Sequence, residues 1–362
     1  MKTIIVKTEP DAYPVRVGAG LLDRLPALMH RDLSRARRCV IATDSFLARS
    51  LGVRAQRAFR AAGWKAELFA LPRGEAAKSL ASVERFFGFL LRAGVERRTP
   101  VVALGGGTVG DAAGFAASAY YRGVPLIQVP TTLLAQVDSA IGGKTAVNHP
   151  LAKNAIGSFY QPRLVVCDTA VLKSLPRREF LSGLGEVVKY ALLFDRAFAR
   201  RLSADWNRLC AFDEGTLEAV VARCAALKAR VVAADTRDLS GTRELLNFGH
   251  TLGHALEKAS GYGRVRHGEA VAWGMRAAAA ISFGRGWTKD KREIDALLAR
   301  LPRVRIPAGL SRRGLLAPLK LDKKAVGGRN VFVLLKGVGN PVRVADVSPA
   351  EIDAAIDAVE GA

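Results

Sequence analysis

The segment VVALGGGTVGDAAGFAA (residues 101–117) is an apolar strand pattern followed directly by a glycine-rich turn and a run of small residues. The turn holds the pattern G-x-G-x-x-G at Gly105, Gly107 and Gly110. Such a turn lets the backbone approach a pyrophosphate, and the helix after it offers unpaired N–H groups and a positive dipole end. Because it joins a strand to a helix, we interpret it as a dinucleotide phosphate loop. The alternative is a tight turn that binds nothing.

Short apolar runs on both sides of this loop predict further strands. They are RCVIATD (38–44), VPLIQVP (124–130) and RLVVCD (163–168), and the first residues, MKTIIVKTEP, also have a strand pattern. The stretch SLASVERFFGFLLRAG (79–94) has a helical pattern. Strands that alternate with helices indicate a mostly parallel sheet covered on both faces.

One acidic residue near the loop bears on how a dinucleotide would lie. The strand after the loop ends in Thr131-Thr132, and no acidic residue follows there to hold a ribose. Asp44 instead ends the strand upstream of the loop. We therefore expect a dinucleotide to run in the reverse of the usual direction, with its ribose near Asp44.

The pattern changes near Ser174-Leu175-Pro176. From there to about residue 300 the segments are long, rich in Ala and Leu, and helical, as in DEGTLEAVVARCAALKARVVAAD (213–235) and EAVAWGMRAAAAISFG (269–284). We predict an α/β dinucleotide-binding domain over residues 1–175. A mainly α-helical metal- and substrate-binding domain is predicted over residues 176–362.

Composition excludes several classes of function. The 362-residue chain has a net charge of +22, but its basic residues are dispersed and do not alternate with aromatic residues, so we do not expect nucleic-acid binding. A basic surface does suit a phosphorylated substrate. We expect no membrane span, no signal peptide and a cytoplasmic location, because no apolar run reaches 18 residues. The four cysteines form no C-x-x-C pair and are interpreted as buried or bystander thiols.

The segment TRELLNFGHTLGHALEKA (242–259) carries polar side chains at spacings of four, three and four: Arg243, Asn247, His250 and His254. On one helix these spacings would place all four on the same face. Such a helix face does not suit an apolar core, because burying its polar side chains without hydrogen-bond partners is costly. Gly249 and Gly253 leave the backbone bare beside the histidines, and we expect another group to approach there closely. A solvated helix face is the alternative.

Histidines gather in this region, since three of the five in the chain lie within residues 250–267, the third being His267. Imidazoles with one carboxylate suit a zinc-type ion, and catalytic zinc sites have three protein ligands and an open position. Spacing alone favours His250 and His254 as a ligand pair. The carboxylate is expected from another helix, where LGEVVKY offers Glu186 with Lys189 three residues later. An exposed ion pair is the alternative interpretation of those two residues.

The chain resembles the 3-dehydroquinate synthase family in ordered blocks that cover most of residues 38–340. The blocks are GGGTVGD (105–111), YYRGVPLIQVPTTLLAQVDSAIGGKTAVN (120–148), KNAIGSFYQP (153–162), GLGEVVKY (183–190), LNFGHTLGHALE (246–257), HGEAVAWGM (267–275) and LDKK (321–324). The resemblance implies an N-terminal α/β nucleotide domain, a helical C-terminal domain and an active site in the cleft. It also implies NAD, a zinc or cobalt ion, and a homodimer.

The implied activity is that of a phosphate-eliminating carbon–oxygen lyase. Its substrate would be 3-deoxy-D-arabino-heptulosonate 7-phosphate, and its products 3-dehydroquinate and phosphate, in the shikimate pathway to chorismate and the aromatic amino acids. Carried onto this sequence, the resemblance implies Glu186, His250 and His267 as metal ligands, which replaces the spacing-based choice of His254.

The resemblance also implies three further sets of residues. For NAD these are Asp44, Glu75, Lys78, Gly105, Gly106, Gly107, Thr108, Val109, Gly110, Asp111, Thr131, Thr132, Asp138, Ser139, Lys144, Lys153, Leu172, Lys173 and Ser174. For the substrate phosphate they are Lys144, Asn154, Asn247, His254 and one of Lys323 or Lys324, with Arg122 reaching in from the partner subunit. For the substrate hydroxyls and carboxylate they are Lys189, Lys228 and Arg243.

Two stretches depart from the family pattern. The family commonly has Asp-Glu-Arg-Glu before the histidine segment, whereas this chain has Asp235-Thr236-Arg237-Asp238, with one extra residue between Lys228 and Arg243. The Arg- and Pro-rich stretch 286–318 matches no pattern. The alternative functions are another sugar-phosphate cyclase, a metal-dependent NAD alcohol dehydrogenase of related fold, and a basic nucleotide- or nucleic-acid-binding protein.

Overall fold

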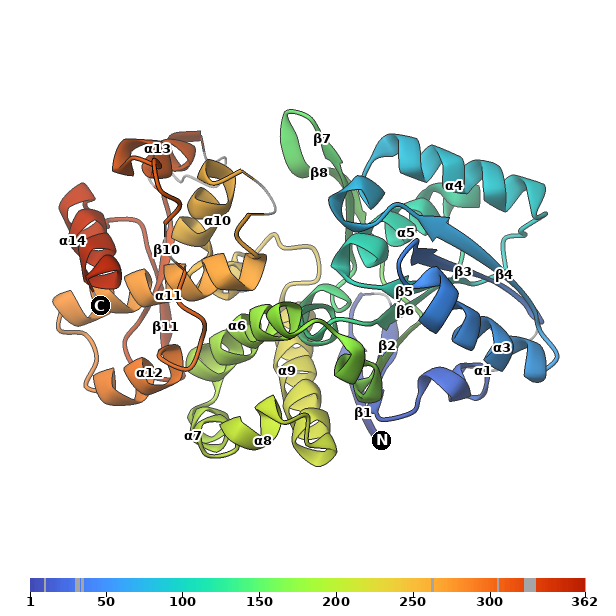
Figure 1. The fold of residues 1–362 in the computed structure, drawn as a ribbon, viewed down its shortest axis with the longest axis horizontal. Helices are drawn as coiled ribbons and strands as arrows, with labels where there is room; N and C mark the ends of the chain where they lie inside the picture. Colours follow the sequence, from blue (N-terminus) through green and yellow to red (C-terminus); the bar gives the residue numbers. More distant parts are fainter. Residues whose placement is uncertain are drawn as a thin grey trace. The chain divides into compact units, whose positions relative to one another are not determined.

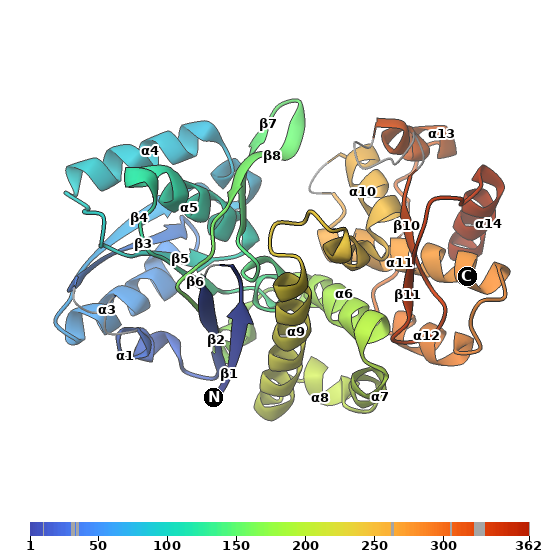
Figure 2. The ribbon, with the colours of Figure 1, turned by 180° about the vertical axis from the view of Figure 1, so that it is seen from behind.

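The computed structural model describes residues 1–9, 11–29, 33, 36–261, 264–304, 306–321 and 330–361 (Figures 1 and 2). The chain forms two compact units. The first consists of Met1–Leu175 and Phe212–Arg237, and the second of Pro176–Ala211 and Asp238–Ala362.

The first unit is built on a seven-stranded sheet of order β1-β2-β9-β6-β5-β3-β4. Its edge strand β1 is antiparallel to β2, and all the other neighbours are parallel. The strands are β1 (Lys2–Lys7), β2 (Ala12–Gly18), β3 (Arg38–Asp44), β4 (Lys65–Leu71), β5 (Val101–Gly105), β6 (Leu126–Pro130) and β9 (Leu164–Asp168). The predicted α/β class and mostly parallel sheet are therefore confirmed.

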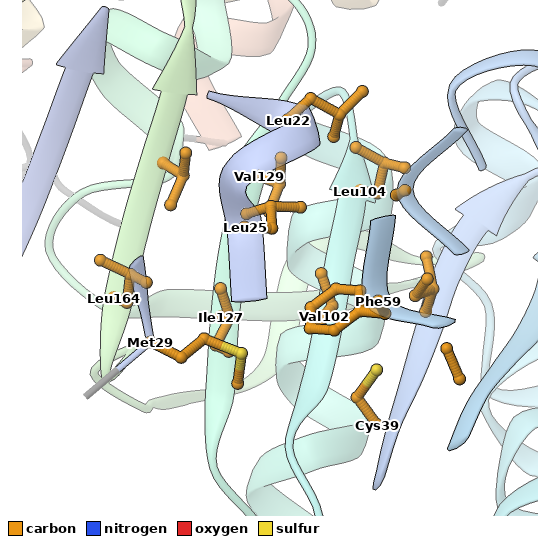
Figure 3. Packing of buried hydrophobic residues seen from close by; sticks show 14 of the residues in the cluster. Leu22, Leu25, Met29, Cys39, Phe59, Val102, Leu104, Ile127, Val129 and Leu164 are labelled. Carbon is orange, nitrogen blue, oxygen red and sulfur yellow. The ribbon is translucent and has the colours of Figure 1, made fainter. Parts of the chain in front are cut away.

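Helices cover both faces of this sheet: α1 (Leu25–Leu28), α3 (Val53–Ala61), α4 (Leu80–Arg92) and α5 (Gly107–Ala119). Side chains of a strand point alternately to opposite faces. Val102 of β5 accordingly lies in one buried cluster with Leu25 and Phe59, as Figure 3 shows. Its neighbour Val101 lies in the other cluster, with Phe86 of α4. The continuous apolar runs of the central strands follow from this two-sided burial.

The helix α9 (Glu214–Ala234) belongs to the first unit, although the sequence analysis placed residues 176–362 in the second domain. It packs against β1 and against the helical turn Ala135–Ser139. Lys228 of α9 forms an ion pair with Asp138 of that turn. This long-range packing makes the first unit discontinuous in sequence, so a single division at about residue 175 does not describe the chain.

A further hairpin in the first unit was not predicted. It consists of β7 (Lys144–His149) and β8 (Ala152–Phe159), which pair antiparallel. The expected NAD- and phosphate-binding residues Lys144 and Asn154 both lie on it.

The second unit is mainly helical, as predicted. Its helices are α6 (Arg177–Phe194), α7 (Arg196–Ala204), α8 (Trp206–Cys210), α10 (His250–Ala259), α11 (His267–Gly284), α12 (Lys291–Leu298), α13 (Arg312–Leu316) and α14 (Pro349–Glu360). An unpredicted hairpin, β10 (Phe332–Leu335) and β11 (Pro341–Val344), completes it. Within the described ranges, no helix has both the length and the apolar character needed to cross a membrane.

The segment 242–259 is not one helix, contrary to the sequence analysis. A short 3-10 turn covers Thr242–Asn247, and α10 begins only at His250. Between them Gly249 has φ +78°, a left-handed conformation that favours glycine. The prediction that Arg243 and Asn247 share a helix face with the histidines is therefore wrong, because the chain changes direction at Gly249.

The close approach expected beside the histidines is made by α11. A Cβ atom on Gly253 would lie 2.9 Å from the carbonyl oxygen of Ala270, and one on Gly274 would lie 1.9 Å from that of Gly249. Both contacts join α10 to α11 backbone against backbone. The glycines in these segments are thus explained by helix packing.

We expect Gly274→Ala to lower the free energy of unfolding by about 1–3 kcal/mol, the usual cost of overpacking. Gly284→Ala is the matched control, because Gly284 ends the same helix and a Cβ there would meet no described atom within 4 Å. The control should be neutral or slightly stabilising. Urea denaturation followed by circular dichroism compares the two, and equal free energies of unfolding would contradict this account of the packing.

Candidate active site

Three side chains of the second unit converge on one point. Glu186 lies on α6 and is 0% exposed, while His250 and His267 are the first residues of α10 and α11. The Nε2 atoms of His250 and His267 lie 3.5 and 3.6 Å from the same oxygen, Oε1 of Glu186. One ligand atom from each of the three residues can be chosen so that all lie within 4.8 Å of one another. The residues that the resemblance implies as metal ligands are therefore together.

The spacing of these donors fits a small divalent ion. A tetrahedral zinc ion with nitrogen and oxygen donors at about 2.0–2.2 Å holds neighbouring donors about 3.4 Å apart. The observed nitrogen–oxygen distances of 3.5 and 3.6 Å are close to that value. Two imidazoles and one carboxylate are also the donor types of a catalytic zinc or cobalt site, whereas magnesium and calcium prefer oxygen alone.

Both histidines present Nε2 to the cluster because each has a partner at Nδ1. Nδ1 of His250 lies 3.2 Å from the backbone oxygen of Phe248, and Nδ1 of His267 lies 3.3 Å from Oε2 of Glu257. Burial holds the pKa of His250 well below its usual value, with the nearby Lys189 acting in the same direction. Burial acts the same way on His267, but hydrogen bonds to Glu186 and Glu257 outweigh it and raise that pKa to about 10. The two carboxylates thus create a place that favours a cation.

Lys189 stands beside the cluster in a buried ion pair with Glu186. Its side chain is 1% exposed. The alternative of a solvent-exposed ion pair is therefore excluded. A buried ammonium three residues from the carboxylate is placed to donate a hydrogen bond to a group bound at the same point.

His254 lies outside the cluster of Glu186, His250 and His267. Its side chain is 57% exposed, and its Nε2 is 4.0 Å from Oε2 of Glu257. A pocket adjoins it, lined by Glu244, Asn247, His250, Thr251, His254, Val331 and Val333. The pocket brings Asn247 and His254 together despite the break at Gly249. Arg243 is 3% exposed within the turn Thr242–Asn247 and does not line this pocket.

In the first unit, the carboxyl ends of the parallel strands collect the residues expected to bind NAD. The register pairs Ala42 of β3 with Ala103 of β5, so that Asp44 and Gly105 end at the same edge. The backbone N–H of Thr131, after β6, donates to the oxygen of Gly105 at 2.9 Å. Open parallel sheets bind nucleotides at this edge.

Two glycines of the loop lie in tight contact with neighbouring side chains. A Cβ on Gly106 would lie 3.2 Å from Cγ2 of Thr132, and one on Gly107 would lie 3.0 Å from Oγ of Ser139. Thr132 and Ser139 belong to the set expected to bind NAD. The loop backbone therefore lies directly against the side chains of these two residues, which would have to shift to admit a larger residue in the loop.

A polar network next to the loop includes four more residues of the expected NAD set. Nζ of Lys78 lies 2.6 Å from Oδ2 of Asp111 and also donates to Oδ1 of Asn154. Burial raises the pKa of Asp111, and Lys78 opposes that effect. Glu75 and Lys153 are paired at 3.6 Å. Asn154, expected at the substrate phosphate, is thus connected to the expected NAD residues.

The other expected residues are placed as follows. Lys228 pairs with Asp138 in the first unit. Leu172, Lys173 and Ser174 lie in the helical turn Thr169–Ser174 directly after β9. Arg122 has φ +61° in the turn that follows α5. Lys323 and Lys324 lie outside the described residues.

One residue of the site was missed. Glu257 follows His250 by seven positions and His254 by three, spacings that place it on the same face of α10. It lies in the segment LNFGHTLGHALE (246–257) but was not among the predicted site residues. The helical period from His250 was the signal that could have identified it.

Solved structures place the fold among the sugar-phosphate cyclases related to dehydroquinate synthase. A 2-deoxy-scyllo-inosose synthase complexed with carbaglucose-6-phosphate, NAD+ and Co2+ superposes with a TM-score of 0.87 at 28% identity, over 99% of both chains. The 2-epi-5-epi-valiolone synthase from Streptomyces hygroscopicus, with NAD+ and Zn2+ bound, gives 0.86 at 26% identity over 98% of both. A sulfoacetaldehyde reductase from Bifidobacterium kashiwanohense shares only the fold, at 0.67 and 17% identity over 96% of both.

Sequence comparisons identify the family. The family model described as 3-dehydroquinate synthase N-terminal matches residues 68–182, and the one described as 3-dehydroquinate synthase C-terminal matches residues 183–325. The 3-dehydroquinate synthase of Symbiobacterium thermophilum is 45% identical over 96% of this chain and 98% of its own length. That of Azotobacter vinelandii is 44% identical over 99% and 97%. The chain belongs to the 3-dehydroquinate synthase family.

The geometry predicts that protein stripped of metal takes up one zinc ion per chain. His250→Ala should abolish tight uptake, because it removes one of three donors, whereas His254→Ala should retain it. Metal content after dialysis, measured by mass spectrometry, distinguishes the two variants. Equal loss of zinc in both would restore the His250 and His254 pair that spacing alone favoured.

Proposed function

We propose that the chain is a 3-dehydroquinate synthase that converts 3-deoxy-D-arabino-heptulosonate 7-phosphate to 3-dehydroquinate and phosphate. NAD and a zinc or cobalt ion would serve as its cofactors. The observation that carries the proposal is the cluster of Glu186, His250 and His267 beside a pocket lined by Asn247 and His254. The family membership and the NAD and metal ions named for the two cyclase structures support it.

The ligand cluster would hold the metal through Oε1 or Oε2 of Glu186 and Nε2 of the two histidines. A divalent ion there supplies a Lewis acid that makes a substrate hydroxyl more acidic. Lys189, buried beside Glu186, would donate a hydrogen bond to the same part of the substrate. NAD supplies reversible hydride acceptance, so the reaction consumes no net oxidant.

The first unit would hold NAD along the carboxyl edge of its sheet. Asp44 is fixed there, because its Oδ1 accepts the N–H groups of Phe46 and Leu47 at 2.8 and 2.9 Å. The ribose would lie near Asp44 and the pyrophosphate at the N-terminus of α5. Lys144 and Asn154 of the β7–β8 hairpin, with Asn247 and His254, would bind the substrate phosphate, whose departure their positive and polar groups would favour.

One assay tests the proposal. The purified protein is incubated with the heptulosonate phosphate, NAD and zinc, and the release of phosphate is measured together with net NADH. We expect phosphate release that needs NAD and metal, without accumulation of NADH. Stoichiometric NADH would instead indicate an alcohol dehydrogenase, and the absence of phosphate release from metal-loaded protein would refute the assignment.

A second candidate is another sugar-phosphate cyclase, favoured by the structural likeness to the inosose and valiolone synthases. Identity to those structures is 28% and 26%, against 45% to a 3-dehydroquinate synthase. The two candidates differ in the carboxylate of the substrate. We assign recognition of that carboxylate to Arg243, because a guanidinium can form two parallel charge-assisted hydrogen bonds with it.

Truncating this side chain should change substrate preference. Hydrogen bonds to charged groups contribute roughly 1.5–3 kcal/mol each, so Arg243→Ala should lower kcat/KM for the heptulosonate phosphate about ten- to a thousandfold. A carboxylate-free sugar phosphate should be affected far less. Arg243→Lys keeps the positive charge but cannot form two parallel hydrogen bonds with the carboxylate, so it should recover only part of the lost kcat/KM. An equal fall for both substrates would mean that Arg243 supports the fold and does not read the carboxylate.

We also propose that the chain acts as a homodimer in which Arg122 serves the partner's site. If so, mixing Arg122→Ala subunits with Lys144→Ala subunits should restore some activity, because one site of each mixed dimer carries neither change. Subunit exchange is verified by native mass spectrometry with one isotope-labelled variant. Mixed dimers that remain inactive would argue against action across the interface.

A further inference from the structure

Each of the two candidate metal-binding histidines must carry its proton on Nδ1 if the lone pair of Nε2 is to bind the metal. In a neutral imidazole one nitrogen carries the proton and only the other can donate a lone pair. At His250 the main-chain oxygen of Phe248 accepts from Nδ1 at 3.2 Å, so that no side chain determines its tautomer. At His267 this role falls to a side chain, since Oε2 of Glu257 lies 3.3 Å from Nδ1.

The geometry points to Glu257 as the positioning residue that fixes His267 for metal binding. The two carboxylates lie on opposite sides of the same ring: Glu186 Oε1 is 3.6 Å from Nε2, and Glu257 Oε2 is 3.3 Å from Nδ1. An acceptor at Nδ1 holds the proton there, leaves the lone pair of Nε2 directed at the cluster and increases its basicity. This inference rests on the metal site of the proposed function.

The placement of Glu257 suits this role. Its side chain is only 13% exposed, so the contact with His267 is shielded from competing water. It lies on α10 while His267 begins α11, and the glycine contacts between these helices fix their separation. The carboxylate also lies 4.0 Å from Nε2 of His254 and therefore connects the ligand cluster to the pocket histidine.

The structure offers one competing role for the same residue. His254, Glu257 and His267 form a second group whose ligand atoms lie within 4.8 Å of one another, which could hold an ion of its own. In that case His267 would have to bridge two ions through both ring nitrogens. The two roles differ in stoichiometry, because a positioning residue predicts one ion per chain.

The test uses zinc alone as the probe. Wild-type protein, Glu257→Gln and Glu257→Ala are stripped of metal and titrated with zinc against a chromophoric chelator. We expect one zinc per wild-type chain and an affinity about 10- to 100-fold weaker in both variants, the usual effect of removing such a partner. The matched control is Glu179→Gln. Glu179 pairs at 2.9 Å with Arg266, the residue before His267, but is not a partner of the imidazole, so its loss should leave zinc affinity unchanged.

A second measurement reads the tautomer directly. The chain has five histidines, so a protein labelled with 15N only in histidine gives few ring signals. With zinc bound, wild-type His267 should show a proton on Nδ1 and a metal-bound Nε2, and Glu257→Ala should lose this single state. Thermal unfolding of the metal-free variants identifies any that has failed to fold. If Glu257→Ala fails, the zinc affinity of the nearly isosteric Glu257→Gln provides the comparison, because its amide oxygen can still accept from Nδ1 but carries no charge.

Each outcome bears on a definite claim. Unchanged zinc affinity in both variants, with an unchanged tautomer in Glu257→Ala, would overturn the role of Glu257 while leaving the metal site and the proposed function intact. Two zinc ions in wild type and one in Glu257→Gln would make Glu257 a ligand and not a positioning residue. No zinc uptake by wild type would overturn both this inference and the metal-dependent reaction.

Discussion

The candidate metal site depends on three helices whose backbones touch at the residues next to the ligands. Gly185 precedes Glu186, Gly249 precedes His250, and Gly268 follows His267. A Cβ on Gly185 would lie 2.8 Å from the oxygen of Gly268, and one on Gly249 would lie 2.7 Å from that of Val271. Because each ligand is next to a glycine at a close contact between α6, α10 and α11, the packing of these three backbones sets where the ligand side chains begin. Such sites are organised before an ion binds.

The charges of the cluster follow from its burial. A carboxylate as deeply buried as Glu186 is costly unless it is paired, and Lys189 provides an opposite charge on the same helix. These two charges largely offset each other, so a divalent ion on the three ligands would leave the cluster positive. The adjoining pocket carries the exposed His254 at its edge. Glu257 beside His267 and Glu244 in the pocket lining reduce this charge. The metal-loaded cluster would still be positive and would favour an anionic group, in agreement with the proposed sugar phosphate.

The phosphate loop illustrates how one motif can satisfy two requirements. A Cβ on Gly105 would lie 2.6 Å from Cβ of Val109, so a larger residue there would force the turn from β5 into α5 to shift. The same turn brings the N-terminus of α5 to the edge where Asp44 ends β3 and Thr131 follows β6. Packing and nucleotide binding therefore demand glycine at the same positions, and the motif alone does not separate them.

The sequence by itself determined most of the central strands, several long helices and the types of side chain available to bind a metal. Apolar runs and helical periods act over a few residues, which is why β1, β3, β5, β6 and β9, with α4, α9 and α11, were predicted close to their observed bounds. The strands β2 and β4 were not predicted. The short hairpins β7–β8 and β10–β11 were also not predicted. The strands β7 and β8 lack a strong apolar run, whereas β10 is one, FVLL, and its signal was overlooked. The histidines of residues 250–267 and the block around Glu186 supplied the right donor types for a metal.

Only the tertiary structure decided how these elements combine. It assigned α9 to the first unit and broke the histidine segment at Gly249. It also placed His267 beside Glu186, an arrangement that the family resemblance implied but that spacing along the sequence did not. It also set Glu257 against the far side of His267. Each of these outcomes depends on packing between helices that are distant in sequence, and the spacing of residues along a single helix contains no information about such contacts.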